Sequence, residues 1–397
     1  MKILILVDDF LPDSIKIAAK MMHELAMQFM KEGHEVTVMA PGKRELSTKE
    51  GNLRVIRYNA GRIKNTSKLR RAINESLLWV RALPIYFFDL RRDRHDMIIY
   101  YSPTIFFGPL VQLLKRTWKC PSYLILRDIF PQWAIDQKIL KKKSLITSYF
   151  KLFEKINYAA ADIIALQSPK NLEWFGTHFS TNKKLSVLYN WTNVLERDDL
   201  PEDSDKYRKK LKLEGKTVFF YGGNMGKAQD MMNLVRLAKN MVQNTNAHFI
   251  FVGLGDEVDL VKKAIIDYGL TNTTYLGAVD QSEYLLLLRE FDVGLFSLHK
   301  SHESHNFPGK LLGYMQNGLP ILGSVNPGND VKELINSHSA GYISINGQDE
   351  ELASYAQKLS NDPILRKKMG EAANQLLKSH FSVQHSTKKI LEEIKEC

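Results

Sequence analysis

Apolar residues along the chain alternate between short continuous runs and helical spacing. Residues 2–7 form an apolar run of the kind found in strands that are buried on both faces. Apolar positions at helical spacing follow in residues 16–31, and after Gly33 a second apolar run occupies residues 35–40. The order strand, helix, strand predicts a βαβ unit and therefore a parallel sheet.

The same alternation continues through both halves of the chain. In the first half it predicts strands at residues 53–58, 96–101, 122–126, 163–166 and 185–188, and helices at residues 69–90, 106–116, 144–161 and 170–176. In the second half it predicts strands at residues 217–221, 248–252, 274–276 and 293–297, helices at residues 230–244, 258–268, 282–289 and 310–316, and a helical end from Pro363. Residues 196–214 are charged, rich in turn residues and without a strand pattern, so they mark a linker between two domains.

The length of 397 residues agrees with two domains, because one hydrophobic core seldom grows beyond about 250–300 residues. The predicted fold class is α/β, with two Rossmann-like doubly wound domains at residues 1–195 and 197–378. The composition is that of an ordinary globular protein, and no run reaches the ~18 uncharged apolar residues of a membrane-spanning helix. Cys120 and Cys397 are too few for a disulfide framework or a metal site, which predicts a reducing, cytoplasmic location.

Positive charge is concentrated in the first half of the chain. Residues 1–190 hold 31 Lys and Arg against 17 Asp and Glu, an excess of 14, while the remainder has a net charge of −3. This one-sided field indicates an anionic partner, either a membrane surface, a nucleic acid or a phosphorylated substrate. Residues 68–94 combine arginines with Trp79, Tyr86, Phe87 and Phe88, a mixture that predicts peripheral contact with an anionic bilayer, and a core helix with a charged outer face is the alternative.

The stretch from Asn306 to Gly323 is predicted as loop, helix, loop and strand. Pro308 suits the start of a helix, because its missing N–H group costs nothing there. A helix that begins after Pro308-Gly309 presents free N–H groups and a positive dipole end, and Lys310 adds a cation in the same turn. The stretch is therefore either an anion site or an ordinary capped helix between two loops.

Glycine follows three further strands of the second half and forms a pattern with this loop. Four glycine-bearing strand ends in one domain favour a site for a nucleotide diphosphate, with Lys227 and Lys310 as counter-charges. Neither a Gly-x-Gly-x-x-Gly turn nor a P-loop is present, so a dinucleotide cofactor and NTP hydrolysis are not supported. The candidate residues of this site are Gly223, Asn224, Met225, Gly226, Gly253, Gly255, Val279, Asn306, Phe307, Pro308, Gly309 and Leu311.

The strand ends of the first domain carry different chemistry. Carboxylate, guanidinium, amide and indole groups gather there, and these groups hold sugars and their phosphates. The candidates are Asp9, Ser14, Arg127, Asp128, Gln132 and Trp133. For Asp128, a local capping role is the alternative.

Several motifs together resemble those of one enzyme family. They are residues 2–7, 33–36, 127–131 (Arg-Asp-Ile-Phe-Pro), 222–226 (Gly-Gly-Asn-Met-Gly), 251–255 (Phe-Val-Gly-Leu-Gly) and 308–320, which begins Pro-Gly-Lys-Leu-Leu-Gly-Tyr-Met. Over essentially its full length the chain resembles retaining GT-B glycosyltransferases of family GT4, in the bacterial O-antigen and capsule branch. Within that branch it is most similar to transferases that add N-acetyl-L-fucosamine from UDP to a lipid-linked sugar.

This resemblance implies a function, a site and a set of partners. The enzyme would move a sugar from UDP to a polyprenyl diphosphate-linked saccharide, with Lys310, Lys227 and Asp128 as catalytic residues. The glycine-rich site would bind the donor, and the strand ends of the first domain would bind the acceptor across a cleft. The helix at residues 380–397 would complete the first domain. Neither a metal nor another cofactor is implied, nucleic acid is not a partner, and the location is the cytoplasmic face of the inner membrane.

Three positions depart from the family pattern, and two alternatives stay open. Where the family has a pair of glutamates this chain has His305 and Gly313, and Asn224 stands where the family has an arginine. A UDP-sugar epimerase on the same fold could recruit His305 and Asp128 for proton transfer. A basic nucleic-acid-binding protein could stack bases on the aromatic residues of the segment 68–94.

Overall fold

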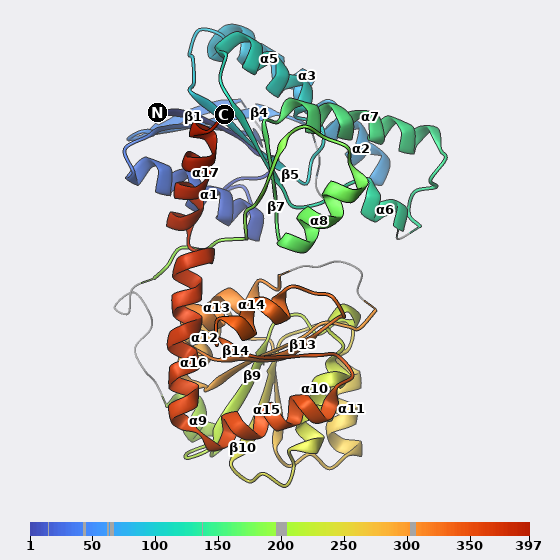
Figure 1. Cartoon of the computed structure of the whole chain (residues 1–397), viewed down its shortest axis with the longest axis vertical. Coiled ribbons are helices and arrows are strands. Elements are labelled where there is room, and N and C mark those ends of the chain that lie inside the picture. Colours follow the sequence, from blue (N-terminus) through green and yellow to red (C-terminus); the bar gives the residue numbers. More distant parts are fainter. Residues whose placement is uncertain are drawn as a thin grey trace. The chain divides into compact units, whose positions relative to one another are not determined.

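The computed structural model describes residues 1–14, 16–42, 45–61, 63, 67–136, 138–195, 205–301 and 307–397. The chain divides into two compact units, of which unit 1 comprises residues 1–192 and 383–397 and unit 2 comprises residues 193–382 (Figure 1). Each unit has its own sheet with helices on both faces. The predicted pair of parallel-sheet, Rossmann-like domains is therefore confirmed.

Unit 1 contains a sheet of eight strands in the order β3-β4-β2-β1-β5-β6-β7-β8. The strands are β1 (Lys2–Leu6), β2 (Glu35–Gly42), β3 (Leu46–Glu50), β4 (Leu53–Asn59), β5 (Met97–Ser102), β6 (Ser122–Leu126), β7 (Ile163–Leu166) and β8 (Lys184–Val187). Among the described strands of this sheet, only β3 and β4 pair in the antiparallel direction. The sequence did not predict β3, because all five of its residues are exposed at the edge of the sheet and form no apolar run.

The helices of unit 1 cover both faces of this sheet (Figure 1). They are α1 (Ile17–Lys31), α2 (Lys68–Ser76), α3 (Leu78–Arg81), α4 (Leu83–Ile85), η1 (Tyr86–Leu90), α5 (Gly108–Trp118), α6 (Gln132–Asp136), α7 (Leu145–Ala160), α8 (Pro169–His178) and α17 (Val383–Lys395). The last helix, α17, packs on α1, and its Thr387 hydroxyl donates to Glu32 at 2.7 Å. Residues of α17 thus contribute to the hydrophobic core of unit 1.

Unit 2 contains six parallel strands in the order β11-β10-β9-β12-β13-β14. The strands are β9 (Thr217–Gly222), β10 (Ala247–Val252), β11 (Thr273–Gly277), β12 (Val293–Ser297), β13 (Ile321–Val325) and β14 (Gly341–Ile345). The helices are α9 (Lys206–Leu211), η3 (Lys227–Gln229), α10 (Met231–Asn240), α11 (Val258–Asp267), α12 (Gln281–Glu290), α13 (Lys310–Gln316), α14 (Val331–Ser337), α15 (Asp349–Asn361), α16 (Pro363–Leu376) and η4 (Leu377–Phe381). The predicted helix over residues 310–316 is confirmed, whereas the region from α14 to α15 was not predicted.

The order of strands in unit 2 reverses between β9 and β12, and Tyr314 fills the point where these strands diverge. The two strands pair only at Val293 with Phe219 and at Gly294 with Phe220. Beyond that point the fully buried Tyr314 hydroxyl donates to the carbonyl of Leu295 at 2.9 Å and accepts from the amide of Gly222 at 3.4 Å. Gly294 makes room for the ring, since a Cβ there would lie 2.3 Å from it.

Removing the Tyr314 hydroxyl tests this bridge. We expect Tyr314→Phe to lower the free energy of unfolding of unit 2 by about 1–2 kcal/mol, because two buried backbone groups each lose a partner. Urea unfolding followed by a probe in unit 2 measures the change. The matched control is Tyr268→Phe, whose side chain is 44% exposed and which should unfold like the wild type. Equal midpoints for Tyr314→Phe and wild type would show that the bridge contributes nothing.

Candidate functional site

The loops at the carboxyl end of the unit 2 sheet form one candidate site. In open parallel sheets, ligands bind at this edge beside the point where strand order reverses. Here that point lies between β9 and β12, and α13 begins above it after the loop that follows β12. The sequence-predicted donor residues that the structure describes all come from the loops after β9, β10, β11 and β12 or from the start of α13.

Lys310 places an unpaired cation at this edge. Its ammonium nitrogen lies 3.4 Å from the centre of the Tyr221 ring, near the end of β9. The nitrogen is buried and has no hydrogen-bond partner among the described residues. Burial lowers the pKa of Lys310 well below its ordinary value. Since a buried charge without a counter-charge is unfavourable, an anion placed here would be strongly stabilised.

The glycines after β9 and β10 hold the two loops against each other. Gly253 and Gly255 have positive φ angles, and a Cβ on them would lie 1.9 Å from the carbonyl oxygen of Gly223 and 2.1 Å from that of Met225. In the same contact the amides of Gly223 and Met225 donate to the carbonyls of Val252 and Leu254, at 2.9 and 2.8 Å. These two amides are engaged within the protein, contrary to the expectation that they face a ligand. The glycines fix the shape of the site through backbone packing.

The start of α13 also differs from the expectation of free N–H groups. The amides of Leu311 and Leu312 donate to the carbonyls of Pro308 and Gly309, at 3.0 and 3.2 Å, so the first turn is closed on itself. The Leu311 side chain is fully buried in the core. At this helix start, the ammonium group of Lys310 is the group that could bind an anion.

The other predicted donor residues lie around these loops. Phe307 is 5% exposed and its ring lies 4.5 Å from that of Phe381, so it anchors the loop before α13. Asn306 lies outside the described residues. Val279 is half-buried beyond β11, and Met225 is fully buried.

Gln229 organises the turn that carries Lys227. Its side-chain oxygen accepts from the Asn224 amide group at 2.9 Å and from the backbone N–H of Gly226 at 3.1 Å. Lys227 itself begins η3 with an exposed side chain. It thus provides a solvated cation, in contrast to the buried one of Lys310.

In unit 1 the strand order reverses between β1 and β5, and the loop after β1 carries Asp9 and Ser14. The Ser14 hydroxyl, which is 7% exposed, donates to the Asp9 carboxylate at 2.7 Å. Arg57, at the end of β4, fastens the same loop by donating to the carbonyls of Phe10 and Leu11 and pairing with Asp13 at 3.3 Å. Ser14 is therefore turned toward the protein, and its hydroxyl supports Asp9.

Arg127 fastens the end of β6 to the segment after β8. Its guanidinium donates to the carbonyls of Leu188 at 2.6 Å and Tyr189 at 3.1 Å and lies 5.5 Å from the Trp191 ring. Burial lowers the pKa of Arg127 to about 10. These contacts show that Arg127, the residue before Asp128, holds the end of β6 against the segment after β8.

Asp128 is exposed beside Arg127 at the carboxyl edge. Desolvation raises the pKa of Asp128, and the charge of Arg127 opposes that shift. Burial raises the pKa of Tyr101, at the end of β5, to about 12, and the negative charges of Asp8 and Asp128 contribute to this shift. The topology thus brings the carboxylates after β1 and β6 to either side of β5.

The remaining predicted acceptor residues lie in α6. The side-chain oxygen of Gln132 accepts from the Lys151 ammonium at 3.4 Å. Trp133 lies in the same helix, and its side chain is outside the described part of the chain. Sequence reasoning did not select Tyr221, Arg57 or Tyr101, although each lies near the carboxyl end of a buried strand, and that position was the available signal.

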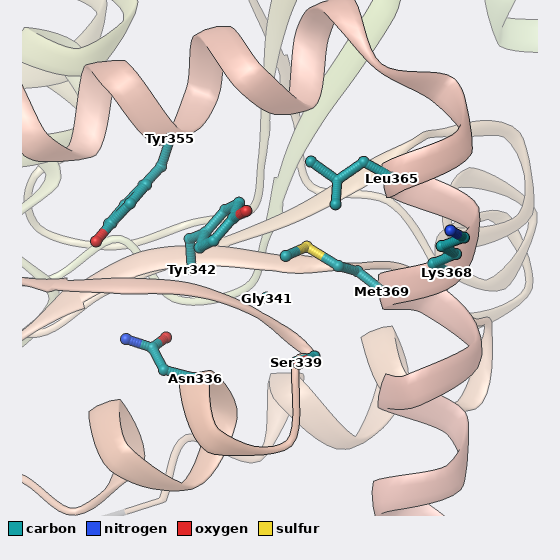
Figure 2. Close-up of a pocket in the computed structure, with 8 residues that line it drawn as sticks. All are labelled: Asn336, Ser339, Gly341, Tyr342, Tyr355, Leu365, Lys368 and Met369. Atoms are coloured by element: carbon teal, nitrogen blue, oxygen red, sulfur yellow. The ribbon is translucent and has the colours of Figure 1, made fainter.

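The hollow drawn in Figure 2 lies elsewhere. It has a volume of about 510 Å³ and is lined by residues of α14, β14, α15 and α16. Gly341, at the amino end of β14, borders it, so it lies away from the carboxyl edge. Figure 2 shows the rings of Tyr342 and Tyr355 face to face, and their centroids lie 4.5 Å apart. The side-chain amide of Asn336 donates to the carbonyl of Ile343 and accepts from its backbone N–H. The hollow therefore does not belong to the strand-end site.

Among the described residues, no group of three or more His, Cys, Asp or Glu residues is placed to hold a metal ion. Within the same residues, no helix is both long and apolar enough to cross a bilayer. The metal-independent reaction implied by the resemblance stays a prediction.

Comparisons with known proteins bear on the family and the fold. Residues 203–376 match the family model described as glycosyl transferases group 1. A probable glycosyltransferase of Pseudomonas aeruginosa, WbjE, is 25% identical over 252 residues, which span 64% of this chain and 63% of that protein. An uncharacterized glycosyltransferase of Methanocaldococcus jannaschii, MJ1069, is 22% identical over 90% of this chain and 88% of its own length.

Solved structures share the fold over the whole chain. Anabaena Alr3699/HepE in complex with UDP superposes with a TM-score of 0.67 at 15% identity, covering 100% of both chains. WaaG, a glycosyltransferase involved in lipopolysaccharide biosynthesis, gives 0.64 at 13% identity, also over 100% of both. These findings support a glycosyltransferase and do not favour the epimerase. Residues 203–376 are therefore similar to the glycosyl transferases group 1 family, within a chain that has the GT-B fold.

Proposed function

We propose that the chain transfers a sugar from UDP to a hydroxyl group of a lipid diphosphate-linked saccharide, with retention of configuration at the sugar. The observation that carries this proposal is the buried, unpaired Lys310 cation at the carboxyl edge of a glycosyl transferases group 1 domain. A diphosphate is the anion that this reaction would place there. HepE was solved with UDP, which supports the same nucleotide for this chain.

The chemistry of the proposed reaction depends on charge that develops on the leaving diphosphate. As the bond from the sugar to the diphosphate breaks, negative charge grows on the leaving oxygen, and Lys310 stabilises it in a site of low dielectric. Lys227 adds a second, solvated cation. The leaving oxygen takes the proton of the acceptor hydroxyl on the same face of the sugar, and Asp128 orients that hydroxyl. No metal is required if the two lysines supply the positive charge.

The donor sugar and the biological role are finer parts of the proposal. The motif resemblance favours N-acetyl-L-fucosamine or a related N-acetylated amino sugar, used in O-antigen or capsule assembly. WbjE is a probable glycosyltransferase and WaaG acts in lipopolysaccharide biosynthesis, which supports a role of this kind. A polyprenyl-linked acceptor stays in the bilayer, so the enzyme would associate peripherally with the cytoplasmic face of the inner membrane.

The direct test incubates the purified chain with a panel of UDP-sugars and a GlcNAc-diphospho-lipid analogue. We expect one N-acetylated amino sugar to be transferred and UDP to be released, with mass spectrometry of the lipid product as the measurement. UDP-sugar turnover without acceptor would instead indicate an epimerase. Tight RNA binding with steep salt dependence and no UDP binding would favour the nucleic-acid alternative.

Replacing Lys310 tests its place in the donor site. We expect Lys310→Ala to lower kcat/KM by about 10²-fold or more, the scale of one lost charged contact in the transition state. Lys227→Ala should lower it less, because that ammonium is exposed. The matched control is Lys239→Ala, near the end of α10. The ammonium nitrogen of Lys239 also lies over a tyrosine ring, 4.4 Å from the centroid of Tyr268. Near wild-type activity of both Lys310→Ala and Lys227→Ala would place the diphosphate elsewhere.

The depressed pKa of Lys310 gives a second test. A bound diphosphate favours the charged ammonium and so raises the pKa of Lys310. At pH values between the pKa of the free protein and the pKa of the UDP complex, UDP binding is therefore accompanied by proton uptake. Affinity for UDP should accordingly fall as pH rises through the free-state pKa. Titration calorimetry in buffers of different ionisation enthalpy measures the proton uptake, and Lys310→Gln should abolish it. Uptake that persists in the variant would assign it to another group.

A further inference from the structure

The outward side of α7 is apolar over its first two turns. Leu145 is 91% exposed, Ile146 60%, Tyr149 40% and Leu152 55%. Residues 145, 149 and 152 are three or four apart and share one side of the helix, and Ile146 borders them. We call these four residues the α7 face. The opposite side of the helix is buried on unit 1 through residues that include Phe150, Glu154 and Tyr158.

Positive charge surrounds the α7 face. Residues 138–155 contain six lysines and one glutamate. Lys141, Lys142 and Lys143 are exposed directly before the helix, whereas Glu154 is 2% exposed and pairs with Lys151 at 2.9 Å. The charge that this region presents to solvent is therefore positive, next to an apolar surface.

The inner side of α7 holds the loop that carries Asp128. The ring of Phe130 lies 4.9 Å from that of Phe150, and Gln132 accepts from Lys151 at 3.4 Å. The helix begins toward the carboxyl edge of the sheet, because it runs back to the amino end of β7. The exposed α7 face thus belongs to the same helix whose buried side contacts the candidate acceptor loop.

The segment 68–94, which the sequence suggested for membrane contact, is divided by the structure. Leu78, Tyr86 and Leu90 are buried in the core, so part of its apolar cluster supports the fold. Phe87 and Phe88 are 54% and 90% exposed, but they lie in η1 near the amino edge of the sheet. Asp89 in that element pairs with Arg54, which lies at the start of β4.

We propose that the α7 face, with Lys141–Lys143, docks on an anionic phospholipid bilayer and brings the loop with Asp128 to the membrane surface. This proposal rests on the proposed function only for the identity of the acceptor. A bilayer matches both features, since it offers hydrocarbon to the apolar residues and anionic headgroups to the lysines. A second copy of the chain would match only the apolar residues, because pairing two α7 faces would bring two clusters of positively charged lysines together.

Vesicle binding by the full chain tests the proposal. Co-sedimentation compares phosphatidylglycerol-containing vesicles with pure phosphatidylcholine vesicles, without substrate. We expect Leu145→Gln, Ile146→Gln and Leu152→Gln together to weaken binding to the anionic vesicles by about 10-fold or more, and Lys141→Gln, Lys142→Gln and Lys143→Gln to remove its salt dependence. The control, Phe87→Gln with Phe88→Gln, changes equally exposed apolar residues and should bind like the wild type.

Three further readouts separate docking from other roles. The triple α7 variant, with Leu145→Gln, Ile146→Gln and Leu152→Gln, should keep the wild-type Tm, because the three side chains that it replaces are exposed. It should keep its activity on a short-chain, water-soluble acceptor and lose it on an acceptor embedded in vesicles. Equal loss on both acceptors, wild-type vesicle binding, or a wild-type dimer that the triple variant dissociates would each overturn the proposal. Vesicle binding that follows the prediction in a chain without transferase activity would leave docking intact and reject the proposed function.

Discussion

The divergence of β9 from β12 is the constraint on which the candidate donor site depends. Two parallel strands that part after one or two residue pairs leave backbone groups without their ladder partners, and the Tyr314 hydroxyl bridges them. The same ring needs Gly294 beneath it, which fixes where α13 packs on the sheet. Because Tyr314 and Lys310 lie four residues apart in this short helix, fixing the ring also fixes the lysine over Tyr221.

The strand-and-helix plan could be predicted because buried parallel strands are continuous apolar runs. Both strands that the prediction missed, β3 and β14, lie at edges of their sheets. β3 is exposed at every residue, and in β14 two of five residues are only half-buried, so neither has the uninterrupted run of a central strand. A strand at an edge is defined by its pairing with one neighbour, and that pairing leaves no continuous apolar run in the sequence.

The site could be predicted as a set of strand-end residues, but its internal contacts could not. Arg127 bonds to carbonyls more than sixty residues away, and Gly253 packs on the backbone of Gly223 thirty residues earlier. A sequence indicates that glycine or arginine is present without indicating what it touches. The assignments to a ligand were therefore reasonable by residue type, whereas for the amides of Gly223 and Met225 the protein itself is the partner.

The position of Lys310 links the stability of the fold to the charge of its ligand. A lysine whose pKa is depressed in the folded state binds fewer protons there than in the unfolded chain, so its burial costs stability at pH values below the unfolded pKa. That cost shrinks as pH rises from the folded value toward the ordinary value of about 10.4, because the unfolded chain then loses the same proton. An anion that pairs with the Lys310 ammonium would reduce this cost. The unliganded fold thus carries an electrostatic penalty at Lys310, and under the proposed function the diphosphate of the donor would relieve it.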